Sequence, residues 1–180
     1  MRRYSQSFRR GGVVLGLLAG VGGAVAVAQE NLSFDIARGQ FNLRITQDDV
    51  TGPSFQVSRL PGELRGRVTD LPVTLRLEDG EVKGNIGTSL VNLDVKKEGG
   101  VLEAKGGFWS RPVTLKLSQD ELKVYVHDCT YRLKAREPGR VYEGKRSCDR
   151  AFVPPTVITL PVGFYAASPE EQASLLLLAL

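Results

Sequence analysis

Apolar and polar residues alternate over five to seven positions at many places along the middle of the chain. Residues 71–77 (LPVTLRL) return 40 residues later as residues 111–117 (RPVTLKL), and segments 41–45, 91–95 and 131–135 carry the same alternation. Shorter alternating segments lie between them and begin at residues 64, 82, 102, 122 and 142, at intervals of 18, 20, 20 and 20 residues. Strict alternation is typical of strands with one buried face, so the pattern predicts strands in a repeat of about 20 residues.

Short turns separate these segments: Pro61-Gly62, Asp79-Gly80, Gly99-Gly100, Gln119-Asp120 and Pro138-Gly139. Turns of this composition predict β-hairpins. We therefore expect an all-β antiparallel meander of about a dozen short strands, from near Leu32 to residues 156–160. Open sheets of more than ~10 strands usually curl or split, so the meander should roll into a barrel or a two-layer sheet. The short strands and their densely charged polar face argue against an outer-membrane barrel.

The last 13 residues, 168–180, have the pattern of an apolar helix. Ser168 fits the N-cap, Pro169 the first helical position and Glu171 the capping box. The apolar part is far too short to cross a bilayer. We expect this helix to pack on the β domain and cover its apolar face or mouth. A docking helix for a partner and a latch over a lipid-binding interior are the alternatives.

Residues 1–28 have the features of a cleavable export signal. Four arginines precede a mildly apolar run that ends in Ala26-Val27-Ala28, a small-x-small triplet typical of signal cleavage. The whole chain has a formal net charge of +4, from 24 basic and 20 acidic residues, so removal of four arginines would leave a neutral chain. The remaining residues, 29–167 and 168–180, would form the β domain and its helix. We expect an exported protein, periplasmic, outer-membrane-associated or secreted, with no transmembrane helix after cleavage.

Cys129 and Cys148 are the two cysteines of the chain, and export would bring them into an oxidising compartment. If Pro138 and Gly139 form a two-residue hairpin loop, residues whose numbers add up to 277 lie opposite each other. Cys129 and Cys148 satisfy this condition. The spacing therefore predicts a disulfide across one hairpin. A functional thiol is the alternative, because His127 and Asp128 precede Cys129.

The sequence offers little catalytic chemistry. It has one histidine, His127, and it lacks a G-x-S-x-G motif, a P-loop and the spacing of zinc ligands. The acid pairs Asp48-Asp49 and Glu170-Glu171 are sequence neighbours, whose side chains point in different directions. We therefore expect no enzyme, no metal and no cofactor.

Basic residues dominate the predicted polar face of the strands, while the acids gather in turns. Trp109 and Arg111 lie at a turn and form a candidate contact tip, although Trp109 could equally cap the core. Twelve bases should project outward. Lys96 and Lys145 are two of them, and the other ten form our candidate anion-contact face: Arg65, Arg67, Arg76, Lys83, Lys105, Lys116, Lys123, Arg132, Lys134 and Arg136. Such bases also keep a strand face soluble, which is the simpler explanation.

These patterns lead to one main functional hypothesis and two alternatives. The main hypothesis is a non-enzymatic cell-envelope or secreted protein with a structural or binding role, whose partner is an envelope protein, an acidic glycan or a lipid. Nucleic acid is not expected. The first alternative is a carrier that holds a lipid or another apolar ligand inside the rolled sheet; an empty interior would favour it, and a helix-filled interior would favour the main hypothesis. An envelope hydrolase is the more distant alternative.

Overall fold

The computed structural model describes residues 30–36 and 39–180, with side chains from Asn42 onward. The predicted export signal lies outside the described residues. Fourteen strands, one 3-10 helix and one α-helix follow each other in the described part of the chain. The strands are β1 (Glu30–Ile36), β2 (Gly39–Ile45), β3 (Asp49–Gly52), β4 (Phe55–Leu60), β5 (Glu63–Val68), β6 (Leu71–Glu78), β7 (Glu81–Ile86), β8 (Ser89–Glu98), β9 (Val101–Phe108), β10 (Arg111–Leu117), β11 (Glu121–Val126), β12 (Cys129–Glu137), β13 (Val141–Arg146) and β14 (Thr156–Thr159). The helices are η1 (Val162–Ala166) and α1 (Pro169–Ala179).

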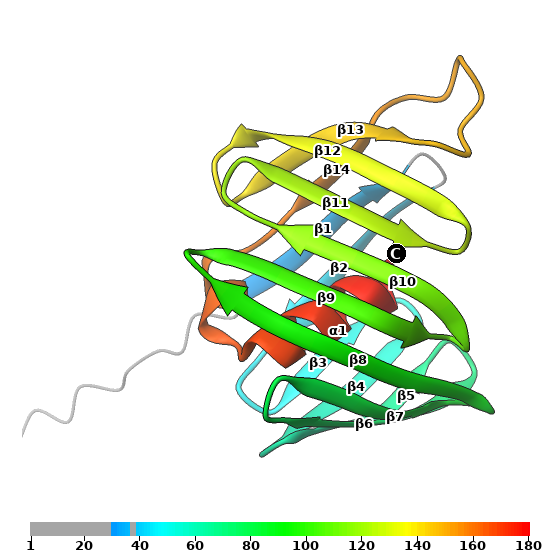
Figure 1. The fold of residues 1–180 in the computed structure, drawn as a ribbon, viewed down its shortest axis with the longest axis vertical. Helices are drawn as coiled ribbons and strands as arrows, with labels where there is room; N and C mark the ends of the chain where they lie inside the picture. Colours follow the sequence, from blue (N-terminus) through cyan, green and yellow to red (C-terminus); the bar gives the residue numbers. More distant parts are fainter. Residues whose placement is uncertain (1–29, 37–38) are drawn as a thin grey trace, which may run out of the picture.

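The strands form one antiparallel sheet in chain order, as the hairpin repeat predicts (Figure 1). The first strand, β1, pairs with β2 and also with β14, so the sheet closes into a barrel. The all-β meander with one C-terminal helix is therefore confirmed. The pattern missed the hairpin of β3 and β4, because β3 has four residues with one buried side chain and ends in Gly52-Pro53, a pair typical of loops.

Alternation along each strand directs one set of side chains into the barrel. In β10, for example, Val113, Leu115 and Leu117 are buried while Thr114 and Lys116 are exposed. Glycines on this inward face allow neighbouring strands to approach closely. A Cβ atom on Gly144 would lie 2.0 Å from the carbonyl oxygen of Arg132, and Gly66, Gly84 and Gly106 show contacts of 1.9, 1.9 and 2.2 Å of the same kind. A side chain at these positions would push the strands apart.

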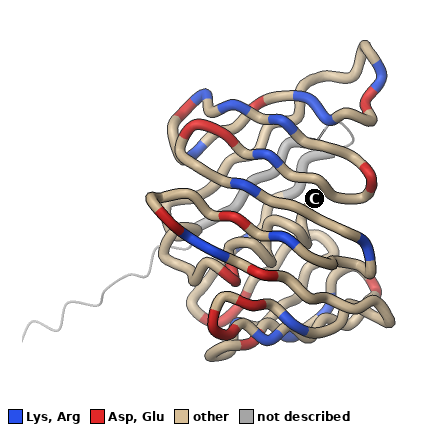
Figure 2. Tube along the Cα trace, viewed as in Figure 1, with Lys and Arg blue, Asp and Glu red and all other residues tan. Residues whose placement is uncertain are grey.

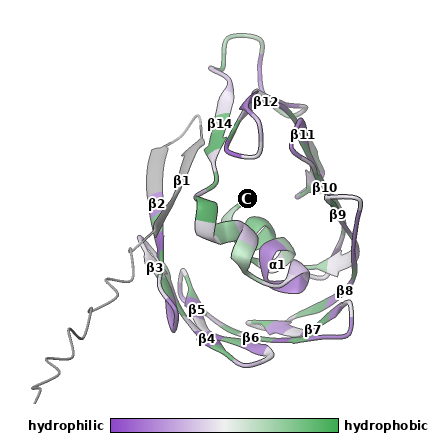
Figure 3. Cartoon of the chain, turned by 90° about the vertical axis from the view of Figure 1, so that its left-hand side faces the viewer, coloured by the Kyte–Doolittle hydropathy of each residue, from purple (hydrophilic) through white to green (hydrophobic). Residues whose placement is uncertain are grey.

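The C-terminal helix α1 lies inside the barrel, surrounded by strands (Figure 3). Its N-cap is Ser168, whose hydroxyl accepts a hydrogen bond from the backbone N–H of Glu171 at 3.2 Å. Every residue from Glu171 to Ala179 is buried, including Leu175, Leu176 and Leu177. A helix that is apolar on all sides is typical of a core element, because each of its faces meets other apolar side chains. Along one side it contacts β6, β7, β8 and β9.

Two acids fix the start of α1 to the sheet. Glu171 accepts hydrogen bonds from Arg59 of β4, with Nε to Oε1 at 2.5 Å and the terminal nitrogen to Oε2 at 3.3 Å. The Arg59 guanidinium also donates to the carbonyl oxygen of Thr46. Glu170 accepts from the backbone N–H of Gly80 at 3.1 Å. The two adjacent carboxylates thus have separate structural partners, and a two-pronged arginine contact fixes the helix more firmly than one hydrogen bond.

The hairpin of β12 and β13 carries the predicted disulfide. Cys129 and Cys148 are joined, with their Cα atoms 5.5 Å apart. Opposed residues from Tyr131–Arg146 to Ala135–Tyr142 have numbers that add up to 277, as expected. The turn itself differs from the prediction, because the register shifts between Ala135 and Glu137 and the loop is one residue longer. A bulge at this point absorbs the extra residue and leaves the cysteine register unchanged.

The hairpin turns form two rims. The entry rim, where the chain passes from β14 into η1 and α1, holds the turns at residues 46–48, 61–62, 79–80, 99–100, 118–120 and 138–140. The far rim holds the turns at residues 53–54, 69–70, 87–88, 109–110 and 127–128 and the loop 147–155. Positive φ angles on the entry rim fall mostly on glycine, but six non-glycine residues of the far rim adopt them: Ser54, Thr69, Trp109, Ser110, His127 and Asp128.

Candidate functional site

Four outward bases on neighbouring strands lie directly opposite one another on the barrel surface. Lys116 of β10 pairs in register with Lys123 of β11, and Lys123 pairs with Arg132 of β12. Arg132 in turn pairs with Lys145 of β13. We call these four exposed residues the basic row. Figure 2 shows blue segments on successive strands of this side of the barrel. With neighbouring strands about 4.8 Å apart, the row spans about 14 Å.

The basic row is poorly compensated by acids. Within the described part of the chain, Lys116 is the one member with an ion pair, to Glu103 of β9 at 3.2 Å. Like charges directly opposite each other in a sheet destabilise it by about 0.2–1 kcal/mol per pair. The row contains three such pairs. The electrostatic potential around the row is therefore positive, and the three repulsive pairs lower the stability of the sheet.

A second row runs across β11, β12 and β13 two residues away. It consists of Glu121, Lys134 and Glu143, which pair in register and alternate in charge. We call it the matched row. Glu143 also forms an ion pair with Arg136 at 3.0 Å. Of the predicted anion-contact face, Lys134 and Arg136 thus lie among acids, whereas Lys116, Lys123 and Arg132 belong to the basic row.

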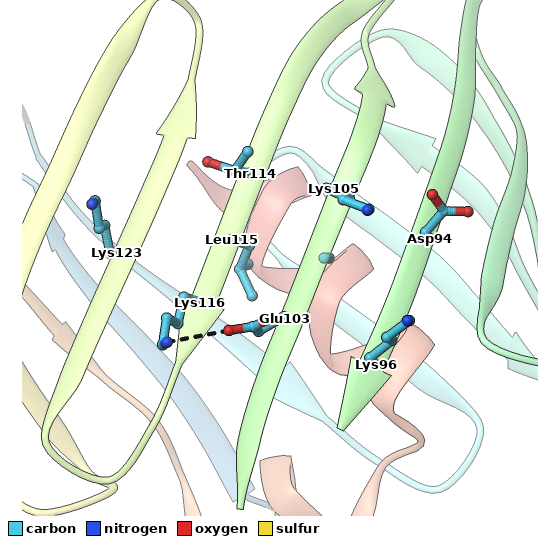
Figure 4. A pocket seen from close by; sticks show the side chains of 9 residues that line it. Asp94, Lys96, Glu103, Lys105, Thr114, Leu115, Lys116 and Lys123 are labelled. Atoms are coloured by element: carbon cyan, nitrogen blue, oxygen red, sulfur yellow. Dashed lines mark ion pairs between the residues drawn. The ribbon is translucent and has the colours of Figure 1, made fainter. Parts of the chain in front are cut away.

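A shallow hollow of about 370 Å³ lies at one end of the basic row (Figure 4). Its lysines come from four strands: Lys96, Lys105, Lys116 and Lys123. Two acids, Asp94 and Glu103, stand among them, and the backbone around Thr114, Leu115 and Ala104 lies beneath. Ammonium groups at several edges of a hollow can contact one carboxylate, sulfate or phosphate together, because each contributes a point charge on a flexible stem.

The remaining predicted bases lie on another part of the barrel, on β5, β6 and β7. Arg65 forms an ion pair with Glu63 at 2.9 Å, and Lys83 pairs with Glu81. Arg67 donates to the carbonyl oxygen of Asp70 at 2.6 Å. Arg76 is exposed and lies opposite both Glu63 and Lys83. These bases have nearby acids or acceptors, so the structure divides the predicted face into two unlike parts.

Two adjacent turns of the far rim bring together the predicted contact tip and the single histidine. Trp109 is partly buried, packs against the core and meets Phe108 edge-on at 6.3 Å between ring centroids. Its ring also lies 6.5 Å from the His127 ring. Arg111 forms an ion pair with Asp128 at 2.6 Å, and the Tyr125 hydroxyl donates to the other Asp128 oxygen at 3.4 Å. We call Trp109, Arg111, Tyr125, His127 and Asp128 the far-rim corner.

The backbone of the far-rim corner is strained. Both central residues of each turn have positive φ: 55° for Trp109, 57° for Ser110, 49° for His127 and 62° for Asp128. This conformation costs about 1 kcal/mol or more at a non-glycine residue, and it is least expected at a bulky one such as tryptophan. Glycine at these four positions would avoid this cost.

Groups for catalysis or metal binding are scarce in this region. No cluster of three or more histidines, cysteines or acids suited to a metal ion occurs among the described residues. His127 is exposed, and its pKa lies below its ordinary value because it loses hydration at the turn and faces Arg111, while Asp128 acts in the opposite direction. Cys129 follows directly but is bonded to Cys148. A disulfide sulfur is no nucleophile, so the thiol alternative has no support in this geometry.

The interior of the barrel is occupied by α1, with an open cavity of about 420 Å³ beside the entry rim. The cavity lies between turns and η1, and its lining includes Leu102, Leu117, Val162 and Tyr165. Gln172 also lines it, and its side-chain Nε2 donates to the carbonyl oxygens of Tyr165 and Ala167 at 3.3 and 2.7 Å. The Tyr142 hydroxyl donates to the carbonyl oxygen of Ser118 at 2.6 Å and lies 3.1 Å from the Tyr165 hydroxyl. This network attaches η1 to the sheet.

Lys96 and Lys145 were not predicted in the candidate face, nor Tyr125 and Asp128 in the contact tip. Opposition of residues across each turn, used in the prediction only for the cysteines, places Lys145 opposite Arg132 and Lys96 opposite Glu103. Applied to the turn at Gln119-Asp120, it places Lys116 opposite Lys123. Bases that are far apart in the sequence are thus neighbours in the folded sheet.

Comparison of the chain with protein-family models, with curated proteins and with solved structures finds no match in any of the three. None of the helices in the described part of the chain is long and apolar enough to cross a membrane. The inference about function therefore depends on the chemistry of the surface itself.

Proposed function

We propose that the protein is exported to the cell envelope and there binds an acidic glycan on its outer sheet face, without catalysing a reaction. The observation that carries this proposal is the basic row, in which Lys116, Lys123, Arg132 and Lys145 lie directly opposite one another. A series of like charges costs stability when no ligand is bound. A polymer with regularly spaced carboxylates would neutralise several of these charges at once.

The filled barrel suits a binding role that uses the outside of the sheet. Strands of a rigid scaffold hold the backbone of these residues at fixed spacings, so the backbone does not have to be ordered when a ligand binds. The disulfide on the β12–β13 hairpin rigidifies two of the strands that carry the row. The residues that bind would be Lys116, Lys123, Arg132 and Lys145, with Lys96 and Lys105 at the adjoining hollow.

The test is binding of sodium alginate, a polyuronate, to the chain without its first 28 residues, measured by isothermal titration calorimetry at rising NaCl. We expect affinity to fall steeply with salt, because exposed charges are screened over about 8–10 Å at 0.1–0.15 M. The double variant Lys123→Glu/Arg132→Glu should bind alginate at least about tenfold more weakly, a loss of about 1.4 kcal/mol.

The matched control is Lys134→Glu, which makes the same kind of change two residues away in the matched row. It should retain most of the affinity, because Lys134 already lies between Glu121 and Glu143. Equal losses for the control and the double variant, or no binding of alginate at low salt, would contradict the proposal.

Carriage of a small apolar ligand is the second candidate function. It is favoured by the open cavity of about 420 Å³ at the entry rim, whose lining combines apolar residues such as Leu102, Leu117 and Val162 with the charged residues Lys97 and Arg140. This volume suits a small molecule, since ligand pockets span about 300–1,000 Å³. Native mass spectrometry of the protein purified from its source should then show a bound species that Leu117→Trp displaces. An unliganded mass throughout would reject this function.

A further inference from the structure

The far-rim corner continues the surface that carries the basic row. Tyr125 follows Lys123 by two residues on β11, so both side chains project from the same face of the sheet about 7 Å apart. On β10, Thr114 lies opposite Tyr125, and Lys116 lies opposite Lys123. A polymer that runs along β10 and β11 from Lys116 and Lys123 toward the far rim therefore passes Tyr125, whose hydroxyl contacts Asp128, the ion-pair partner of Arg111.

The groups in the corner are those that recognise a sugar ring. The C–H face of a pyranose packs on flat aromatic rings, and Trp109 and His127 place two rings side by side, with centroids 6.5 Å apart. Sugar hydroxyls pair well with planar groups that donate or accept two hydrogen bonds at once, as guanidinium and carboxylate groups do. Arg111 and Asp128, held 2.6 Å apart, supply both beside the rings.

The backbone of the corner indicates that its side chains matter individually. Trp109, Ser110, His127 and Asp128 all keep positive φ angles where glycine would fit without strain. Ser110 stabilises its turn by accepting a hydrogen bond from the N–H of Leu90 at 3.0 Å. Cys129, next to Asp128, is tied to Cys148 of the adjacent hairpin. The corner is thus a rigid arrangement, as a recognition site for a stiff ring requires.

We propose that the far-rim corner is a sugar-ring subsite, in which Trp109 and His127 pack on a pyranose of the bound acidic glycan while Arg111, Asp128 and Tyr125 bind its hydroxyl groups. The inference rests on the proposed function and extends it. The basic row would supply attraction to any polyanion, and the corner would distinguish a polysaccharide from other polyanions.

The chain contains a single tryptophan, so tryptophan emission excited at a wavelength that tyrosine does not absorb reports on this corner alone. The experiment titrates the chain without its first 28 residues with two polyanions at pH 7: an alginate hexasaccharide, and polyacrylate, which has carboxylates but no sugar rings. We expect the hexasaccharide to shift the Trp109 emission, and polyacrylate to bind without changing it. Calorimetry on the same samples measures both affinities.

Three variants separate recognition from folding. Trp109→Ala should weaken hexasaccharide binding about tenfold and leave polyacrylate binding unchanged. Trp109→Phe keeps an aromatic ring against Phe108 and should retain most of the affinity. Asp128→Asn preserves a residue type that tolerates positive φ, and it should weaken hexasaccharide binding without loss of thermal stability.

Each result separates this inference from the proposed function. Alginate binding with an unchanged Trp109 emission, or equal effects of Trp109→Ala on both polymers, would overturn the sugar-ring subsite and leave the basic row as a general polyanion site. Failure of both polymers to bind would overturn the proposed function as well. An emission shift with phosphatidylglycerol vesicles but not with alginate would replace the glycan by a lipid surface, with exposed Leu90 and Phe152 as the contacts.

Discussion

The matched row crosses three of the four strands of the basic row, β11, β12 and β13, two residues away, but charges alternate in the matched row and repeat in the basic row. In the matched row, Lys134 lies between Glu121 and Glu143, so each neighbour is attractive. In the basic row, Lys123 lies between Lys116 and Arg132, so each neighbour is repulsive. Both rows project from the outward face of these strands. The difference therefore lies in the choice of side chains.

This contrast separates two explanations of a charged strand face. Solubility requires charge on the surface, but it is served equally well by alternating signs, as in the matched row. Repeated charges of one sign add nothing to solubility that alternation would not supply, and they lower stability. The basic row is therefore better explained by an anionic ligand than by solubility alone.

Removal of the disulfide should have the largest effect, because it acts on the hairpin that both rows share. The double variant Cys129→Ser/Cys148→Ser should lose about 3 kcal/mol of unfolding free energy, since the bond closes a loop over a sequence separation of 19. Urea denaturation measures the loss. Arg132 and Lys145 lie nearer the bond than Lys134 and Glu143, so hydrogen exchange should rise more at the basic row. Equal exchange at both rows would contradict this order.

Charge reversal should change stability in opposite directions in the two rows. Lys123→Glu turns two repulsive pairs into attractive ones and should raise the unfolding free energy by about 0.2–1 kcal/mol per pair. Lys134→Glu places three acids side by side and should lower it by a similar amount. Urea denaturation at low salt measures both, and 0.5 M NaCl should reduce both changes. A loss of stability in Lys123→Glu would show that the basic row is not repulsive.

The smallest predicted effect is that of the basic row on the pKa of His127, which tests how far the electrostatic field of the row extends. The pKa of His127 is lowered by loss of hydration and by Arg111 and is raised by Asp128. Arg111→Gln should therefore raise this pKa and Asp128→Asn should lower it, while Lys123→Glu should leave it nearly unchanged because exposed charges are screened. NMR titration of the single histidine measures each value.

The same lowered pKa has a consequence for stability. The folded chain holds the proton on His127 less tightly than the unfolded chain does. Its contribution to stability is therefore present above the ordinary pKa of about 6.5 and is lost as the pH falls through the lowered value. A pKa above the ordinary value would contradict the described surroundings of the ring.

Much of the fold follows from local rules in the sequence. Alternation and turn residues predict the hairpins, and the positions of Cys129 and Cys148 predict the disulfide, because opposition across a turn depends only on residue numbers. The short strand β3 was not predicted, because its four residues contain a single buried side chain, Val50, and so show no alternation. The pairing of β1 with β14 that closes the barrel could not be predicted from local patterns either, because it joins distant parts of the chain.

The site was harder to predict, because it depends on contacts between hairpins. The sequence shows that Lys116, Lys123, Arg132 and Lys145 project outward, but their adjacency appears only when registers of three successive strand pairs are combined. The far-rim corner depends in addition on the positive φ angle of Trp109, which no local preference of tryptophan predicts.

The position of α1 after all the strands has a consequence for how the molecule is made. The inward face of the sheet stays uncovered, and β1 stays without β14, until the last part of the described chain has been synthesised. Folding that depends on such distant contacts is slow, and the nascent chain keeps open strand edges for long. A fold that is completed this late is compatible with the export proposed above, because a threading channel requires an unfolded chain.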